Sequence, residues 1–307
     1  MATPMDLISV VIPTFNAGPY VAEAIESALA QTDPCFEIVV VDDGSSDGTL
    51  DVVRRYEARV RILAQENKGA AVARNNGIAH ARGHYIAFLD ADDLWLRDKL
   101  VRQRRLFETY PDLVAVAGGL KTINEVGDTT PHKQNARFKH CYDRPLHLHH
   151  DLLHFGNMIP QSSVMAVKRV VQQAGGWYAR ERILSTDYDL WIRLAERGRL
   201  YVSSEVVGSY RVLERSLSHG SLTKEYEGQR RILEMHRQHF TPVEYRHRLS
   251  RLYQEWAESA FVKNDATAWM VIRDALRKDL LNFDAWRLAA KQTIAQPARR
   301  AFSRVPA

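Results

Sequence analysis

The sequence has few cysteines and lacks the short motifs that mark several common enzyme classes. Its 307 residues include two cysteines, Cys35 and Cys141, which form no CxxC pair. This usage suggests neither a disulfide framework nor a zinc ribbon and fits a reducing compartment. No GxGxxG follows the first apolar run, and neither GxxxxGK[ST] nor GxSxG occurs. These absences weaken an NAD-dependent dehydrogenase and exclude a P-loop site and the nucleophile elbow of an α/β-hydrolase.

Long hydrophobic runs and a broad excess of charge are also missing. No stretch approaches the roughly 20 apolar residues of a transmembrane helix, and Met1–Asp6 lacks the features of a signal peptide. We therefore expect a soluble, cytoplasmic protein. The net charge of +5 equals the five basic residues that lie between Ala285 and the last residue, a stretch without Asp or Glu. The rest of the chain is balanced, which argues against nucleic acid as a partner.

Apolar runs alternate with helical patterns through the first half of the chain. The predicted strands are Leu7–Ile12, Phe36–Val41, Val60–Ala64 and Tyr85–Leu89, and the predicted helices are Tyr20–Leu29, Thr49–Arg59 and Gly69–Ala81. This order predicts an α/β fold with a mostly parallel sheet and helices on both faces. Loops and short elements are expected at Pro131–His154. Helices are expected from Thr223 onward, with an apolar stripe at Trp269, Ile272, Leu276 and Leu280.

Polar side chains follow these predicted strands at the points where the strands end. Asn16 follows the first strand, Asp42 and Asp43 follow the second, and Asp90 and Asp92 follow the fourth. Ligands of such sheets bind beyond the carboxyl ends of the strands. We therefore expect a ligand site at this edge of the sheet.

The aspartates of Asp90-Ala91-Asp92 follow a buried strand directly. Two carboxylates in such a place cost desolvation energy unless they are compensated. A divalent cation, Mn²⁺ or Mg²⁺, bound together with diphosphate oxygens would compensate them, because these ions prefer oxygen ligands. The alternative is that the aspartates cap a helix that starts near Leu94.

Three further positions each allow a functional and a structural interpretation. Asp42 can accept hydrogen bonds from a base or a ribose, or it can stabilise the turn before the helix at Thr49. Arg74 can reach inward to a phosphate or to the acidic cluster, or it can lie on the surface. Asp187 opens a helix, where a carboxylate can accept a proton or cap the helix.

Histidines are concentrated between residues 140 and 154, and they could bind zinc. The spacing of His147, His149, His150 and His154 matches no standard zinc site, so we do not expect one.

Taken in order, the segments above resemble the family 2 glycosyltransferases, which have the GT-A fold. The segments that carry the resemblance are SVVIPTFN (9–16), VVDDGSSDGT (40–49), NKGAAVARNNGIAHARGHYIAFLDADD (67–93), GGW (175–177), TDYDLWIRL (186–194) and YR (210–211). The resemblance implies a GT-A domain at residues 1–220, with a nucleotide-binding half at 7–118 and an acceptor half at 119–220. A helical region at 221–307 would follow it.

The resemblance implies a role for each matching residue. The nucleotide would be held by Pro13, Thr14, Asn16, Asp42, Arg74 and Asp90, with Asp42 on the uracil. Asp92 would ligate the metal, and Asp90 would face the ribose or the metal. Asp187 would be the catalytic base. The family pairs a Glu with this Asp, whereas this chain has Thr186, so the contact that the Glu makes to the acceptor is not expected here.

The implied activity is inverting transfer of a sugar, in polysaccharide biosynthesis, from a nucleotide-sugar donor of the UDP type. The sugar would pass to a hydroxyl of a glycan or a lipid-linked glycan. Two alternatives stay open, a non-catalytic relative that binds a nucleotide sugar or glycan and a metal-dependent nucleotidyltransferase. The basic segment Pro297–Ala307 is either a solvated tail or a weak peripheral contact with the inner face of a membrane.

Overall fold

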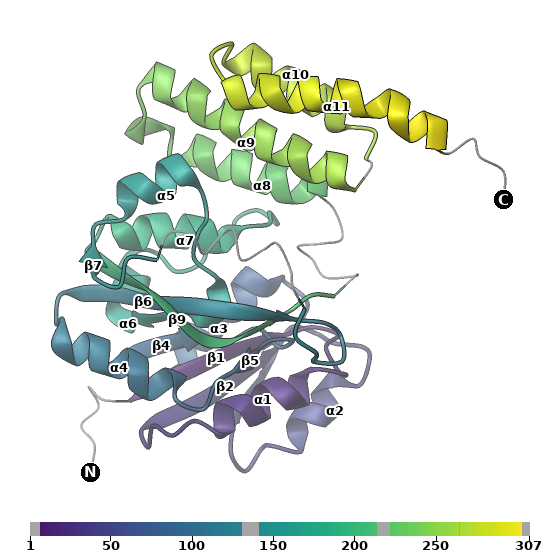
Figure 1. Ribbon diagram of the computed structural model, residues 1–307. Coiled ribbons are helices and arrows are strands. Elements are labelled where there is room, and N and C mark those ends of the chain that lie inside the picture. Colours follow the sequence, from purple (N-terminus) through teal and green to yellow (C-terminus); the bar gives the residue numbers. More distant parts are fainter. Residues whose placement is uncertain (1–6, 131–140, 214–221, 264, 303–307) are drawn as a thin grey trace. The chain divides into compact units, whose positions relative to one another are not determined.

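A computed structural model describes residues 7–130, 141–213, 222–263 and 265–302 of the chain (Figure 1). The chain divides into two compact units, one formed by Met1–Arg182 with Thr186–Glu214 and the other by Ile183–Ser185 with Arg215–Ala307. The boundary expected at residue 220 lies outside the described residues.

A sheet of nine strands forms the centre of the first unit, as far as the chain is described. Its order is β3-β2-β1-β4-β8-β6-β9-β5, and β7 also pairs with β9. The strands are β1 Ile8–Thr14, β2 Phe36–Asp42, β3 Arg61–Ala64, β4 Tyr85–Phe88, β5 Leu94–Trp95, β6 Leu113–Ile123, β7 Pro145–Leu146, β8 Met165–Val167 and β9 Arg199–Arg211. Strands β1–β4, β6 and β9 run in one direction, and the other three run against their neighbours. This confirms the predicted α/β fold with a mostly parallel sheet.

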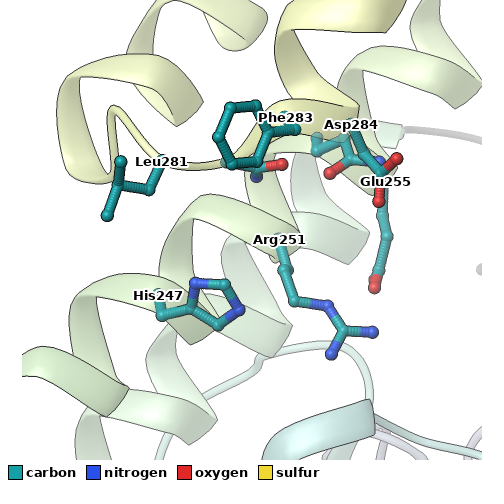
Figure 2. A pocket seen from close by; sticks show the side chains of 8 residues that line it. His247, Arg251, Glu255, Leu281, Phe283 and Asp284 are labelled. Atoms are coloured by element: carbon teal, nitrogen blue, oxygen red, sulfur yellow. The ribbon is translucent and has the colours of Figure 1, made fainter.

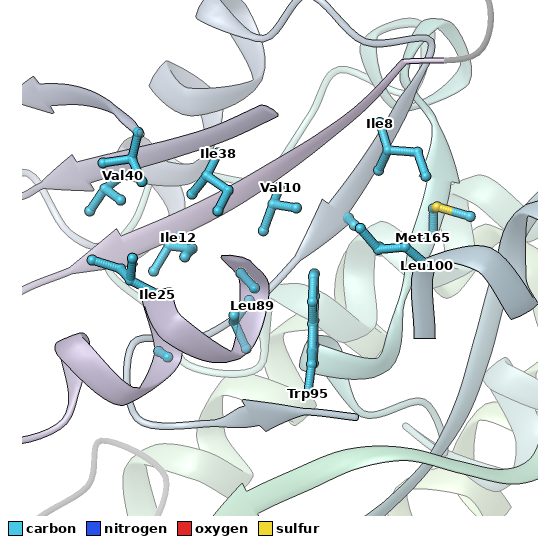
Figure 3. Packing of buried hydrophobic residues seen from close by; sticks show 14 of the residues in the cluster. Ile8, Val10, Ile12, Ile25, Ile38, Val40, Leu89, Trp95, Leu100 and Met165 are labelled. Carbon is cyan, nitrogen blue, oxygen red and sulfur yellow. The ribbon is translucent and has the colours of Figure 1, made fainter. Parts of the chain in front are cut away.

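Helices cover both faces of this sheet, because the alternating side chains of its central strands are apolar on each face. The helices of the unit are α1 Val21–Leu29, α2 Thr49–Arg54, α3 Ala70–His80, α4 Lys99–Thr109, α5 His149–Phe155, α6 Lys168–Gln173 and α7 Thr186–Ala195. On one face, Val10 and Ile12 of β1 join Ile25 of α1 in a large cluster of buried apolar residues (Figure 3). On the other face, Val41 of β2 packs with Ala73 of α3.

Helix α3 approaches the sheet closely because it carries a glycine at the contact. A Cβ atom built on Gly77 would lie 2.5 Å from a methyl carbon of Val11 and 3.2 Å from one of Val41. A side chain at this position would push the helix away from the strands. The position of α3 matters for the site, because this helix also carries Arg74.

The structure departs from the prediction at several elements. Strands β6 and β9 were not predicted, helix α2 ends at Arg54 instead of Arg59, and strand β1 continues through Pro13 to Thr14. Proline is tolerated there because the pairing of β1 with β4 ends at Val11, so Pro13 has no partner strand on that side. Residues 141–154 hold β7 and part of α5, which agrees with the expected short elements.

Helices form the second unit, as predicted. They are α8 Leu222–Met235, α9 Pro242–Val262, α10 Ala268–Lys278 and α11 Phe283–Phe302. The predicted apolar stripe is wrong at both ends: Ile272 is buried and Leu276 partly so, but the side chains of Trp269 and Leu280 are 37% and 70% exposed. Among the described residues, no helix combines the length and apolar character needed to cross a bilayer.

Candidate functional site

Two polar side chains lie side by side where β1 and β2 end. Thr14 and Asp42 are register partners on the two strands, and each is 2% exposed. The Oδ2 atom of Asp42 accepts a hydrogen bond from the Ser45 N–H at 3.2 Å. Within the described part of the chain, the hydroxyl oxygen of Thr14 and the Oδ1 atom of Asp42 are buried and have no hydrogen-bond partner. A buried polar atom without a partner costs about 1–3 kcal/mol, so these two oxygens suit a ligand that supplies the missing bonds.

The neighbouring polar residues are held by the protein itself. Asp43 accepts hydrogen bonds from the backbone N–H groups of Lys68 and Gly69 at 2.9 and 2.8 Å, and so fixes the loop before α3. The side-chain oxygen of Asn16 accepts a hydrogen bond from the Ser46 N–H at 2.9 Å, which joins the loops after β1 and β2. Asp43 and Asn16 therefore hold the loops beside Thr14 and Asp42 in place.

The acidic segment after β4 leads into a strand. Residues Leu94–Trp95 form β5, and helix α4 begins only at Lys99, so the alternative in which the aspartates cap a helix near Leu94 is wrong. The alternative in which Arg74 lies on the surface is also wrong. Its side chain is 11% exposed, and its Nη2 atom lies 2.8 Å from Asp90 Oδ1, within the acidic cluster.

Three carboxyl groups within four consecutive residues give this segment unusual electrostatics. Burial, reinforced by the Asp90 carboxylate, raises the pKa of the half-buried Asp92 to about 6. Burial and the charges of both neighbours hold the pKa of Asp93 well above its usual value. Ser162 Oγ and the Arg211 N–H donate to Asp93 at 2.5 and 2.9 Å. The carboxylates of Asp90 and Asp92 thus fit a divalent cation, whose charge would offset their mutual repulsion.

Arg211, at the end of β9, fixes the acidic segment through hydrogen bonds. Its side chain is 1% exposed, and its guanidinium donates to the backbone oxygens of Asp92 at 2.9 Å and Glu125 at 2.8 Å and to the carboxylate of Glu23 at 2.7 Å. A planar group with several donors suits such a junction. Arg211 thus fixes the backbone of Asp92 through this hydrogen bond.

Asp187 lies in the first turn of α7, as expected, and is half-buried. Its Oδ2 atom accepts a hydrogen bond of 2.7 Å from the side-chain amide of Asn157. Four residues further on, the side-chain amide of Gln161 donates to Asp90 Oδ1. A span of four residues reaches at most about 14 Å. One short segment therefore contacts both the predicted base and the acidic cluster.

The Gly-Gly-Trp segment positions the helix that carries Arg74. The side-chain amide of Asn75 both donates to and accepts from the backbone of Trp177, each at 2.8 Å. Gly176 has φ +68°, and a Cβ there would lie 2.5 Å from the Asn75 oxygen, so only glycine fits. The Arg74 guanidinium lies 4.5 Å from the centre of the Trp177 ring, a cation–π contact that helps to orient it.

The histidines of residues 147–154 do not converge on one centre within the described residues. His149 pairs with Glu196 at 3.3 Å, and the ring of His150 stacks on that of His154. A cavity of about 340 Å³ lies in the second unit, lined by residues of α9 and the start of α11 (Figure 2). None of the predicted site residues lines this cavity.

Sequence reasoning thus named Thr14, Asp42, Arg74 and the aspartates, but missed Asn157 and Gln161. Both missed residues lie in a segment of loop and short 3-10 turn, at Asn157–Ser163, without hydrophobic periodicity. No local pattern distinguishes them from other loop amides, because their importance comes from which distant carboxylates they contact.

Comparison with known proteins identifies the family of the chain. The model for glycosyl transferase family 2 matches residues 9–170. The chain belongs to this family. An uncharacterized glycosyltransferase of Rickettsia typhi is 30% identical over 227 residues, which cover 72% of this chain and 69% of that protein.

Other relatives match over shorter stretches. The β-1,3-glucosyltransferase WfaP of Escherichia coli, named for UDP-Glc and a GlcNAc-diphosphoundecaprenol, is 40% identical over 107 residues, which cover 34% of this chain and 43% of WfaP. Glycosyltransferase GlyG of Streptococcus pneumoniae is 48% identical over 93 residues, which cover 29% of this chain and 31% of GlyG. The chain thus spans less than half the length of these relatives.

Solved structures share the fold at lower identity. S. aureus TarS 1-349 in complex with UDP-GlcNAc has a TM-score of 0.60 and 17% identity, over 88% of each chain. The mannosyltransferase PcManGT of Pyrobaculum calidifontis, in complex with GDP-Man and Mn²⁺, has a TM-score of 0.62 and 20% identity, over 96% of this chain and 83% of that one. These likenesses confirm the expected GT-A fold.

Proposed function

We propose that this enzyme moves a sugar from a nucleoside diphosphate, of the UDP type, onto a hydroxyl of a glycan or lipid-linked glycan, with inversion at the anomeric carbon. The observation that carries the proposal is the segment Asn157–Gln161, which tethers Asp187 and Asp90 together. A base for the acceptor and a charged site for the donor diphosphate must lie in one cleft for a single displacement to occur. WfaP, a relative named for a lipid-linked acceptor, motivates the acceptor class.

The nucleotide site of the proposal lies at Pro13, Thr14 and Asp42. Uracil presents one N–H between two carbonyl oxygens. The unpaired Oδ1 of Asp42 can accept from that N–H, and the unpaired hydroxyl of Thr14 can donate to a neighbouring carbonyl. Arg74, which pairs with Asp90 in the acidic cluster, would bind a phosphate oxygen of the donor. Residues 7–118 would form the nucleotide-binding half, and residues 119–220 would contact the acceptor.

The proposed reaction uses the carboxylates of Asp187, Asp90 and Asp92. The acceptor oxygen attacks the anomeric carbon as its proton passes to the carboxylate of Asp187, and the bond from that carbon to the diphosphate oxygen breaks. Mn²⁺ or Mg²⁺ held by Asp92 and Asp90 would supply positive charge to the departing diphosphate. Arg211 keeps the backbone of Asp92 in place during this exchange.

A donor screen tests the proposal. UDP-glucose, UDP-GlcNAc and GDP-mannose are added with Mn²⁺, and the melting temperature and the released products are measured. A bound donor raises the melting temperature by mass action. Release of a nucleoside diphosphate with sugar transfer supports the proposal, release of pyrophosphate indicates a nucleotidyltransferase, and binding without turnover indicates a non-catalytic relative.

The base-binding residue is tested separately by replacing Asp42 with Ala. A hydrogen bond to a charged group contributes about 1.5–3 kcal/mol, so UDP affinity should fall by roughly 10- to 100-fold. Asp51→Ala is the matched control, because this carboxylate lies on α2 with 75% of its side chain exposed. Equal UDP affinity in Asp42→Ala and the control would exclude Asp42 from the nucleotide site.

The proposed place of action is the cytoplasmic face of a membrane that carries the acceptor. Both cysteines are free thiols, which fits the expected reducing compartment. The basic tail Pro297–Ala307, for which a weak membrane contact is proposed, carries side chains outside the described residues.

A further inference from the structure

An exposed apolar corner lies in the second unit, where α10 turns into α11. Four large side chains are exposed within seven residues: Leu280 is 70%, Leu281 73%, Phe283 76% and Trp286 50% exposed. Soluble surfaces commonly carry single exposed apolar side chains, but a contiguous group marks a surface that contacts another apolar phase. Figure 2 shows Leu281 and Phe283 of this corner.

The turn that presents the two leucines is rigid. The carboxylate of Asp279 accepts hydrogen bonds from the Leu281 N–H at 2.9 Å and from His247. The buried Asn282 caps α11 by accepting from the Ala285 N–H at 3.0 Å, and its amide nitrogen donates to Ser250 at 2.9 Å. The turn that carries the two exposed leucines is thus fixed at both sides by hydrogen bonds, and Leu281 also lines the cavity beside α9.

The indole ring of Trp286 has its N–H hydrogen-bonded within the protein. Its indole N–H donates to the backbone oxygen of Leu280 at 3.0 Å. The only polar atom of the ring therefore has a partner within the protein. The ring can enter an apolar phase without leaving an unsatisfied donor.

The outward face of α11 combines apolar and basic side chains. Trp286 and Ala290 follow Phe283 by three and seven residues, so these three side chains lie on one face of the helix, and all are exposed. Ala285 lies on the opposite face and is buried. Arg287 and Lys291 follow Phe283 by four and eight residues, so they flank this apolar face, and both are exposed. Aromatic residues bordered by cations are typical of helices that lie in a membrane interface.

We propose that this corner, formed by Leu280, Leu281 and the outward face of α11, docks on an anionic lipid surface. The charges favour lipid over a second copy of the chain. From Ala285 to the end, the sequence holds five basic and no acidic residues. Two copies of this face would bring net positive surfaces together, because Arg287 and Lys291 outnumber the single acid of α11, Asp284. An anionic headgroup layer attracts each of them.

The proposal differs from the membrane contact proposed for the tail, because it assigns docking to a structured, apolar corner. It also does not depend on the proposed reaction: an enzyme that failed to bind vesicles could still transfer a sugar, and the reverse also holds.

Co-sedimentation of the full-length protein with vesicles tests the proposal. The vesicles contain phosphatidylglycerol and phosphatidylcholine, or phosphatidylcholine alone, and the salt concentration is low or moderate. The main variant is Leu281→Ser with Phe283→Ser, which leaves the Trp286 hydrogen bond intact. The matched control is Val243→Ser with Val262→Ser, since these side chains of the same unit are 66% and 77% exposed. Melting curves verify that each variant folds.

The wild type should sediment with the anionic vesicles, more strongly at low salt. Affinity should fall by at least about tenfold in the corner variant, because each large side chain withdrawn from lipid contributes roughly that factor, and should stay unchanged in the control. Arg287→Gln with Lys291→Gln should remove most of the preference for anionic lipid. Equal sedimentation of wild type and corner variant would overturn the proposal. Loss of vesicle binding only in the triple variant Arg299→Gln, Arg300→Gln, Arg304→Gln would assign the contact to the tail. Wild-type dimers that form without vesicles and are abolished in the corner variant would show that the corner mediates self-association.

Discussion

Replacing Asp92 by Asn should stabilise the metal-free protein near neutral pH while abolishing sugar transfer. The pKa of Asp92 is raised from its ordinary value of 3.8 to about 6 by burial and by the Asp90 carboxylate. The folded protein therefore holds this proton more tightly than the unfolded chain does. The ionised form costs the folded state free energy, which asparagine, a neutral side chain of the same shape, does not.

The size and pH dependence of the effect follow from the shift. A difference of about two pH units corresponds to about 3 kcal/mol as an upper limit. Below pH 4 both states are protonated and Asp92 has no effect on stability. Between about pH 4 and 6 the unfolded chain loses the proton first, so stability falls as pH rises, and above pH 6 the full cost is present. The increase in the free energy of unfolding caused by Asp92→Asn should thus be small at pH 4.5 and largest at pH 8.

Thermal melting in EDTA across this pH range measures the effect. Asp112→Asn is the control with the opposite sign, because the hydrogen bond from Arg199 lowers the pKa of the exposed Asp112. That variant should show no gain at pH 8. Mn²⁺ and UDP at 1,000 times the dissociation constant should then make wild type more stable than Asp92→Asn, because such a ligand stabilises by about 4.1 kcal/mol and only wild type should bind it well. If Asp92→Asn melts at or below wild type at pH 8 without metal, the electrostatic reasoning fails.

Three further predictions concern the base and the fold. Asp187→Asn should lose most of kcat while keeping donor affinity, because the lost group acts on the acceptor proton; near-normal kcat would show that another residue is the base. Asn157→Ala should move the acid limb of the pH–rate profile up by about 1–2 pH units with little change in donor KM, since the ionised base loses one hydrogen bond; an unmoved limb would leave Asn157 a structural residue. Gly77→Ala should lower the free energy of unfolding in urea by about 1–3 kcal/mol, because its Cβ would meet Val11, and an unchanged midpoint would contradict the close approach of α3.

The first four strands could be predicted because their signal is local. Runs such as Ile8–Ile12 and Phe36–Val41 are apolar on both faces and end at turn residues, which is the pattern of a strand buried between two layers of helices. The expectation that ligand groups gather after these strands followed from chain direction alone.

Strands β6 and β9 escaped prediction for the opposite reason. Strand β6 contains Gly118-Gly119 at its centre, and β9 contains Ser203-Ser204-Glu205, which are residues that local propensity does not assign to strands. The two strands form because they pair with each other along almost their whole length. A Cβ on Gly118 would lie 2.8 Å from a methyl carbon of Val207. The glycine therefore makes room for the side chain of the partner strand, which the sequence around Gly118 does not reveal.

Sequence alone therefore determined the α/β pattern, the family resemblance and the residue types at the edge of the sheet. Tertiary structure decided which of them meet. Arg74 reaches Asp90 and not the surface, the Asp42 carboxylate keeps an unpaired oxygen while that of Asp43 is consumed by a loop, and Arg211 joins Glu23 to the acidic segment across 188 positions. Local patterns report hydrogen bonds between near neighbours, whereas these contacts depend on strand order and register, which only the packed chain sets.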